Sequence, residues 1–318
     1  MSRNKKVSES LFQFMNLLIA LLMKNGQYRT SLHYRATLNS FKRYRDNQDI
    51  ALSEIDADVM RSYEAYLHHT AKVCSNTSSF YLRILRATYN KAVAKGLTPQ
   101  QHPFREVYTG IAQTRKRAIS TESVSQIKRL ESVKKLSPKE EMARDTFLMS
   151  FYLRGISFFD LAHLRKSDLK YDYLHYTRSK TGQRLTIRWK KEMQELLEKY
   201  QAQTVTSPYL FPFLVDEGNK RLDKTIDKKR DEKRLYHNAE ARISYHLRKL
   251  GVKIGIKGKL TPYVARHSWA TAARDNQIPI SVISEALGHH SEITTQIYLR
   301  SIKSSEVDDA NAKILAVL

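Results

Sequence analysis

Cysteine is almost missing from this 318-residue chain, whose one example is Cys74. That scarcity excludes a disulfide scaffold and a cysteine-based zinc site. Long apolar runs are missing too, since the longest (17–23) is far shorter than the roughly 20 residues that cross a bilayer. This run lies deeper than the apolar region of a signal sequence, and no A-x-A-like site follows it. The sequence predicts a reduced, soluble, intracellular protein with no membrane partner.

Acidic side chains are scarce relative to basic ones: 32 Asp and Glu face 55 Lys and Arg, a net charge of +23. Residues 1–117 carry +11 of this excess and residues 118–318 carry +12. The excess is therefore not one basic tail, and a hydrophobic content of 41% is enough for real cores. Such a distribution favours a long polyanion held from two sides, because each neutralised phosphate releases counterions. A basic surface that serves only solubility is the alternative.

The N-terminal part shows helical periodicity and no strand pattern. We expect four helices: over 11–23, around 34–43, from about 56, and from the Ser/Thr cluster at 76–79. Basic side chains lie off the apolar stripes of the second and fourth helices. The candidate DNA-binding residues among them are Arg35, Lys42, Arg83 and Arg86. These faces can follow a phosphate backbone, although on spacing alone a solvated polar face is as good an explanation.

The C-terminal part mixes helices with a small sheet. We place a basic linker at 106–118, with the DNA-binding candidates Arg115, Lys116 and Arg117, between domains at 1–105 and 119–318. Residues 184–188 alternate with period two after a turn at 180–183, which predicts a hairpin. The expected fold class is mainly α with a small antiparallel β-sheet.

Four short stretches carry the chemistry. Leu287-Gly288-His289 is followed, nine residues after the histidine, by Tyr298. Arg266 lies in a box, 261–268, that begins 28 residues before His289. These motifs resemble the tyrosine recombinase (phage integrase) family, whose signature is L-G-H followed by a nucleophilic tyrosine, preceded by an H-x-x-R box. Tyr263 stands where that box usually has histidine.

The other two stretches match less completely. Lys180, in the hairpin turn, resembles the lysine that the family carries between two strands. The family's first arginine falls here on Ser157, and Arg154 lies three residues earlier. If this region is helical, positions 154 and 157 share one face. We expect Arg154 to take the arginine role; a salt bridge to Asp160 or to the acidic pair at 140–141 is its alternative.

The resemblance implies a metal-free strand transfer. A tyrosine hydroxyl has a pKa near 10 and is a poor nucleophile unless it is assisted. Arg154 and Arg266 would hold the non-bridging phosphate oxygens, Lys180 would protonate the departing 5′ oxygen, and His289 with Tyr263 would orient the phosphate. Tyr298 would become a 3′-phosphotyrosine, so no ATP, metal or other cofactor is needed. For Tyr263, a packing role is the alternative.

The resemblance also implies an architecture and a partner. Residues 1–105 are similar to the family's SAM-like core-binding domain, and 119–318 to its mixed α+β catalytic domain with a C-terminal tail helix. The partner would be double-stranded DNA with specific recombination sites, clamped by a homo-tetramer whose apolar tails dock on neighbours; a tail folded on its own domain is the alternative. The expected product is integration, excision or inversion, in the bacterial cytoplasm at the nucleoid, as in mobile-element or invertase subgroups.

Two other functions compete with the recombinase. A type IB topoisomerase-like enzyme uses similar chemistry on one duplex. A catalytically impaired DNA-binding or accessory protein would also explain the departures at Ser157 and Tyr263. Each motif residue alone has an ordinary structural explanation, so the recombinase prediction depends on the fixed order of lysine, arginine, histidine and tyrosine.

Overall fold

The computed structural model of this chain describes residues 10–112, 118–133, 135–215 and 228–299. Contacts divide the chain into two compact units, Met1–Thr114 and Arg115–Leu318. Among the described helices, none combines the length and the apolarity needed to span a membrane.

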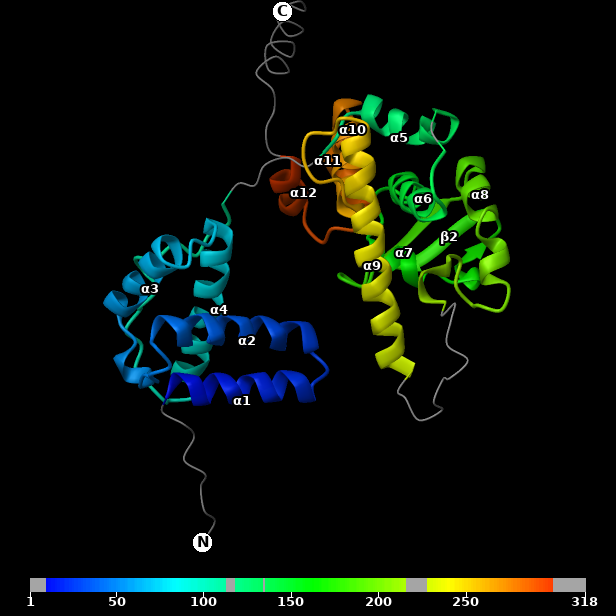
Figure 1. The fold of residues 1–318 in the computed structure, drawn as a ribbon. Coiled ribbons are helices and arrows are strands. Elements are labelled where there is room, and N and C mark those ends of the chain that lie inside the picture. The colour runs from blue at the N-terminus through cyan, green and yellow to red at the C-terminus, as the bar shows by residue number, and fades with distance from the viewer. Residues whose placement is uncertain (1–9, 113–117, 134, 216–227, 300–318) are drawn as a thin grey trace, which may run out of the picture. The chain divides into compact units, whose positions relative to one another are not determined.

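The first unit is helical, as the sequence predicts. Its helices are α1 (Leu11–Lys24), α2 (Tyr28–Tyr44), α3 (Ala57–His69) and α4 (Ser75–Ala94), with a 3-10 turn at Leu52–Glu54. Figure 1 shows α1 and α2 side by side as a helical hairpin. Asp56 begins α3 by accepting a hydrogen bond from the amide of Val59 at 2.8 Å. Phe41, Tyr63 and Leu82 lie in the fully buried core of this unit.

The predicted linker begins in ordered structure. Residues 106–112 pack on the first unit, because Val107 is buried in its core and Asn76 on α4 exchanges two hydrogen bonds with the main chain of Ala112. The amide of Tyr108 also donates to Glu64 at 3.0 Å. The part of the linker that carries Arg115, Lys116 and Arg117 lies outside the described residues.

The second unit has a helical core and one small sheet. Its helices are α5 (Thr121–Val133), α6 (Pro138–Tyr152), α7 (Phe158–His163), α8 (Lys191–Glu198), α9 (Lys228–Lys253), α10 (Pro262–Asp275), α11 (Ile280–Ala286) and α12 (Glu292–Leu299). Helix α6 begins with Ser137 and Glu140 in a capping box and with Pro138 in the first turn. It packs on α9 and α10, which makes it the central helix of the unit.

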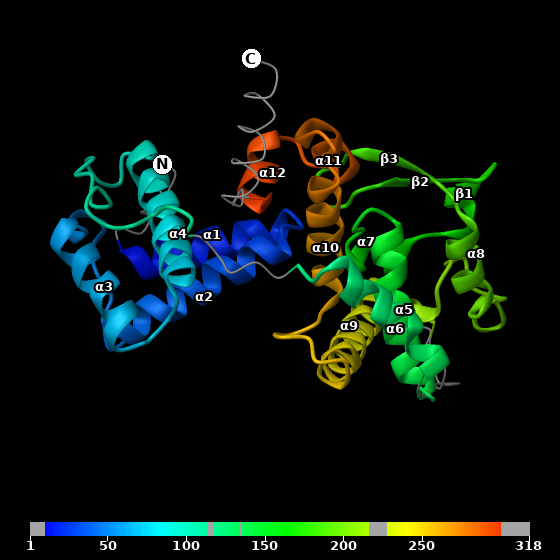
Figure 2. The ribbon, with the colours of Figure 1, turned by 90° about the horizontal axis from the view of Figure 1, so that it is seen from above.

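The sheet has three antiparallel strands in the order β1 (Leu169–Lys170), β2 (Tyr173–Thr177) and β3 (Arg184–Arg188). The predicted hairpin is confirmed: β2 and β3 pair from Tyr173↔Arg188 to Thr177↔Arg184. Leu185 and Ile187 point into the core while their neighbours on β3 are exposed. In Figure 2 the β2–β3 turn, residues 178–183, lies beside α11.

Candidate active site

Arg266 is the buried centre of the candidate site. It lies on α10 and is only 3% exposed. Its Nη1 donates to the carbonyl of Gly155 at 2.8 Å, while its Nη2 donates to the carbonyl of Leu287 and lies 3.0 Å from Nε2 of His289. Partners from two separate segments, the α6–α7 loop and the L-G-H motif, fix the plane of the guanidinium. The fold thus brings together the R box and the L-G-H motif.

His289 is held as a neutral imidazole. A guanidinium only donates, so the Nε2 atom that faces Arg266 accepts, and Nδ1 carries the proton that it gives to Oγ1 of Thr295 at 2.8 Å. Burial, followed by the charges of Arg266, Arg178 and Lys180, lowers the pKa of His289 to about 4. At neutral pH the ring therefore orients Arg266 and carries no charge.

The segment between α6 and α7 holds the candidate first arginine. Helix α6 ends at Tyr152, and Arg154 and Gly155 both have left-handed backbones, with φ of 57° and 74°. The expectation that positions 154 and 157 lie one helical turn apart is wrong, because these left-handed residues end the helix. A non-glycine residue in this conformation is strained, and such strain concentrates at functional sites.

Ser157 is engaged elsewhere. Its Oγ accepts from the amide of Asp160 at 3.1 Å and donates to Oδ2 of the same residue at 2.8 Å, which caps the N-terminus of α7. Arg154 is half-buried, and within the described part of the chain it forms no ion pair with Asp160 or with the acidic pair at 140–141. This arrangement favours Arg154 over Ser157 for anion binding.

Gly155 sets the distance between the first-arginine segment and α10. A Cβ at this position would lie 2.6 Å from Cα of Arg266, closer than real contacts allow. The absence of a side chain lets the main chain beside Arg154 touch α10. Tyr176 on β2 lies near the charges around this contact. Burial, followed by the charge of Asp160, raises its pKa, and the positive charges of Arg266, Arg178 and Arg154 partly offset that rise.

Lys180 lies exposed in the β2–β3 turn. The turn is closed by main-chain bonds at 2.8 Å from Arg178 to Gln183 and from Gly182 to Arg178. The amide of Ser179 donates to Oδ1 of Asp160 at 3.0 Å, which ties the turn to α7. Lys180 is close enough to His289 to lower the pKa of that ring.

Sequence reasoning missed two residues of this neighbourhood. Asp160, 5% exposed, accepts from both the cap of α7 and the turn that carries Lys180. From the sequence, Asp160 is expected only as an ion-pair partner of Arg154. Arg178, 8% exposed, donates to the carbonyl of Gly288. Its place two residues before Lys180 was the only available signal.

Tyr263 lies one helical turn before Arg266 on α10. It is 49% exposed, and its ring meets that of His267 edge-to-face with centroids 4.7 Å apart. A ring exposed to this degree is not a core residue, although it packs against His267.

Position 298 belongs to α12, and the side chain of Tyr298 lies outside the part that the structure describes. Helix α12 is held by Thr295, which is fully buried and bonded to His289, and by Leu299 in a small core with Ile283. The bond to Thr295 therefore ties α12, the helix of position 298, to His289.

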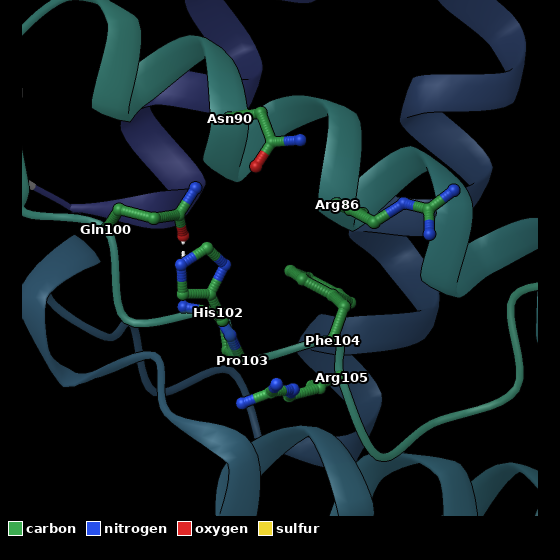
Figure 3. A pocket seen from close by; sticks show the side chains of 7 residues that line it. All are labelled: Arg86, Asn90, Gln100, His102, Pro103, Phe104 and Arg105. Atoms are coloured by element: carbon green, nitrogen blue, oxygen red, sulfur yellow. Dashed lines mark hydrogen bonds between the residues drawn. The ribbon is translucent and has the colours of Figure 1, made fainter.

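The first unit carries the other basic residues that the sequence singles out. Arg35 and Lys42 lie on α2, and Arg83 and Arg86 lie on α4. Lys42 covers the ring of Phe12, with Nζ 5.3 Å from its centroid, while Arg86 is exposed and bonds to Oγ1 of Thr109 at 2.8 Å. A recess of about 370 Å³ lies beside Arg86, and Figure 3 shows the side chains that line it. The lining residues are Arg86, Asn90, Gln100, His102, Pro103, Phe104 and Arg105.

The second unit thus gathers cations where a phosphodiester could bind. Arg266 and Arg178 are buried and bonded to carbonyls, Arg154 is half-buried, and Lys180 is exposed beside them. Buried charges are costly unless they are hydrogen-bonded, and an anion would add a further favourable partner. Within the described residues, no group of three or more His, Cys, Asp or Glu is arranged to hold a metal ion.

Known proteins share both the sequence and the fold. The chain is 22% identical over 312 residues to the tyrosine recombinase XerC of Leptospira interrogans, covering 98% of this chain and 94% of that protein. The tyrosine recombinase XerA of Pyrococcus furiosus is 31% identical over 176 residues, 54% of this chain and 55% of that protein.

Solved structures share the fold. A lambda integrase dimer bound to a COC′ core site superposes with a TM-score of 0.62 at 17% identity, covering 92% of this chain and 98% of that one. The Tn1549 transposon integrase in complex with a circular intermediate DNA gives 0.67 at 12% identity, covering 96% and 100%.

Family assignments cover both units. Residues 10–107 match the Phage integrase SAM-like domain, and residues 122–305, more than half of the chain, match the Phage integrase family. Together with the R box and L-G-H motif that meet at Arg266, these matches show that the chain belongs to the phage integrase family, the tyrosine recombinases.

Proposed function

We propose that this tyrosine recombinase cleaves and rejoins DNA strands at specific sites through a covalent bond between DNA and Tyr298. The observation that carries the proposal is the bonded chain from Arg266 through His289 to Thr295. It links the buried cation that would hold a phosphate to the helix that carries position 298.

The phosphate would lie against Arg266 and Arg154. Two guanidiniums can bind the non-bridging oxygens in pairs and stabilise the charge that develops as the phosphorus becomes five-coordinate. Neutral His289 holds Arg266 in place and adds no charge that would have to be neutralised. Tyr263, one turn before Arg266, would contact the same phosphate in place of the usual histidine.

Cleavage balances without an outside energy source. The Tyr298 oxygen bonds to phosphorus and its proton passes to water, while the bond from phosphorus to the 5′ oxygen breaks and Lys180 gives that oxygen a proton, which the amine regains from water. The phosphotyrosine retains the energy of the phosphodiester. A 5′ hydroxyl from another strand can then attack it and release Tyr298, so rejoining needs no cofactor.

DNA would be held by both units. In this proposal a core-binding domain (1–105) and a catalytic domain (119–318) flank the linker at 106–118. Arg35, Lys42, Arg83 and Arg86, with Arg115, Lys116 and Arg117 of the linker, would contact phosphates. Such contacts are independent of sequence and strongly salt-dependent.

Assembly on DNA is part of the proposal. A lambda integrase tetramer bound to a Holliday junction superposes with a TM-score of 0.62 at 16% identity, covering 94% of this chain and 80% of that one. We propose that this protein also forms a tetramer on DNA, with the tail beyond α12 docked on a neighbouring copy. The site of action would be the bacterial cytoplasm, at the nucleoid.

A trapping experiment tests the catalytic claim. Duplexes selected by the protein from a randomised pool are nicked near the crossover position, so that cleavage releases a short fragment and cannot be reversed. The wild type is expected to form an adduct that survives a denaturing gel, and Tyr298→Phe is expected to form none while binding the same DNA.

Three outcomes would contradict the proposal. No adduct from the wild type would leave a DNA-binding accessory protein as the function. An equal adduct from Tyr298→Phe would assign the nucleophile elsewhere. Efficient relaxation of a supercoiled plasmid that lacks the selected site, without strand exchange at that site, would indicate a topoisomerase.

A further inference from the structure

The β2–β3 turn is fastened to the L-G-H segment at several points. Nη1 of Arg178 donates to the carbonyl of Gly288, and Oγ1 of Thr181 donates to the same carbonyl at 3.2 Å. Nε2 of His290 lies 2.7 Å from the carbonyl of Thr181 and must donate to it. The contacts join segments more than a hundred residues apart, in the region where Figure 2 shows the turn beside α11.

Arg178 is the buried member of this set. Only 8% of its surface is exposed, and burying a guanidinium is costly unless its donors are satisfied. The carbonyl of Gly288 offers the partner, and the missing side chain of Gly288 leaves the room, since a Cβ there would lie 3.0 Å from Cδ of Arg178. Replacing Arg178 by a small residue would open a gap and free the carbonyl.

Lys180 lies between the anchored residues but is itself exposed. On one side Ser179 donates to Asp160 of α7, and on the other Thr181 is bonded to Gly288 and His290. Because the four-carbon side chain of lysine is flexible, its ammonium group can be positioned accurately only if its main chain is held in place. The position of the Lys180 ammonium group therefore depends on these anchors.

We propose that Arg178 is a positioning residue for strand cleavage: it locks the Lys180 turn onto the L-G-H segment, so that the proton donor and the phosphate-binding arginine keep one geometry. This inference rests on the proposed function. It predicts that loss of Arg178 slows the step that needs the Lys180 proton more than it slows the same step when no proton is needed.

A change of leaving group separates this role from a general structural one. In the natural substrate the bond from phosphorus to the 5′ oxygen breaks and Lys180 supplies a proton. With sulfur in place of that bridging oxygen, the departing group is a thiolate. A thiol ionises near pKa 8.5, so it leaves without a proton donor. Cleavage of the sulfur substrate therefore does not need a well-placed Lys180.

The experiment measures single-turnover adduct formation on nicked duplexes that differ only in this bridging atom. Wild type is compared with Arg178→Ala, Arg178→Lys and Lys180→Ala, and with Arg188→Ala, which removes an exposed arginine at the far end of the same hairpin. Gel-shift binding and thermal unfolding of each variant are recorded alongside.

On the oxygen substrate we expect Arg178→Ala to cleave about 100-fold more slowly than wild type, with Lys180→Ala at least as slow, since a proton donor contributes about 10²–10⁴. On the sulfur substrate both should come within about fivefold of wild type, by the same argument. The cleavage rate of Arg178→Lys on the oxygen substrate should lie between those of the wild type and Arg178→Ala. Arg188→Ala should match the wild type on both substrates.

Other results overturn the inference. Equal losses on both substrates would mean that Arg178 supports the fold or the phosphate site in general. Wild-type rates for Arg178→Ala on oxygen would mean that the turn is placed without it. Failure of the sulfur substrate to rescue Lys180→Ala would remove the donor that Arg178 is said to position. The absence of any wild-type adduct would instead refute the proposed function.

Discussion

The two halves of the chain carry nearly the same excess charge, +11 over 1–117 and +12 over 118–318, and they hold it differently. In the catalytic unit Arg266 and Arg178 are buried and bonded to main-chain carbonyls. In the first unit Arg35 and Arg86 are exposed on helix surfaces. A fixed, buried cation can serve one anion in one geometry, whereas an exposed one can serve any nearby phosphate. The position of the cations in the fold, and not their number, therefore distinguishes those proposed for chemistry (the chemical charges) from those proposed to bind DNA (the binding charges).

The largest effect that follows from this difference concerns the first arginine. Arg154→Ala should slow adduct formation by about 10²–10³-fold at saturating DNA, because a group that stabilises the developing charge at the reaction centre is worth this much. Ser157→Ala should cost only about 1 kcal/mol of stability through the lost cap of α7, with cleavage within a few-fold of wild type. Single-turnover assays and thermal unfolding measure the two quantities.

Ser157→Ala is thus the matched control, three residues away in the same segment. If Ser157→Ala lost as much cleavage as Arg154→Ala, the segment as a whole would matter and the arginine would not be special. Unchanged cleavage by Arg154→Ala would place the second phosphate contact on another cation of the site.

The close approach behind Arg154 should have the next largest effect. Gly155→Ala adds a Cβ that would meet Arg266 at 2.6 Å on a left-handed backbone, and we expect a loss of about 3 kcal/mol in unfolding free energy. Gly182→Ala has nearly the same φ but open space around it, so about 1 kcal/mol is expected. Denaturant unfolding measures both, and equal losses would mean that strain alone, without the contact, explains Gly155.

These glycines also show what could be predicted from the sequence. The helices and the hairpin followed from periodicity, and the meeting of Arg266 with His289 was implied by the family resemblance. The left-handed break at Arg154 was not predicted, because positions 154 and 157 were placed on one face of a helix and the close approach of Gly155 to α10 exists only in three dimensions.

The contacts of Asp160 and Arg178 were equally hidden, for a physical reason. Both act through main-chain groups: Asp160 through the amide of Ser179, and Arg178 through the carbonyl of Gly288. A main-chain partner can be any residue type, so no pairing of letters in the sequence reveals it.

A smaller effect tests whether His289 is held neutral. Its pKa is about 4 in the folded protein against about 6.5 when unfolded, so the unfolded chain binds more protons between these values. The stability that neutral His289 contributes is fully present above pH 6.5 and is lost as the pH falls toward 4. From pH 6.5 to 5 we expect the wild type to lose about 1 kcal/mol more than His289→Asn, a value reduced for the solvent screening of a half-buried ring.

Two other groups titrate without confusing this comparison. Burial lowers the pKa of His246, which destabilises in the same direction but is present in both proteins. The hydrogen bond from Lys253 lowers the pKa of Glu140 to about 2, and the stability it contributes is lost only below the measured range. Parallel stability curves for wild type and His289→Asn would mean that His289 titrates normally.

The smallest effect belongs to the exposed charges. Arg86→Ala should weaken DNA binding by less than about tenfold and reduce the magnitude of the salt slope, d log K/d log[salt], by about 1, because one phosphate contact is lost. Cleavage at saturating DNA should not change. Arg61→Ala is the matched control: Arg61 is also exposed, but it is already paired with Asp58 and Glu106. Gel shifts across a salt series measure the slopes. An equal change of slope in both variants would show that net charge, and not a contact at Arg86, determines binding. A loss of cleavage by Arg86→Ala at saturating DNA would show that the binding charges and the chemical charges are not separate.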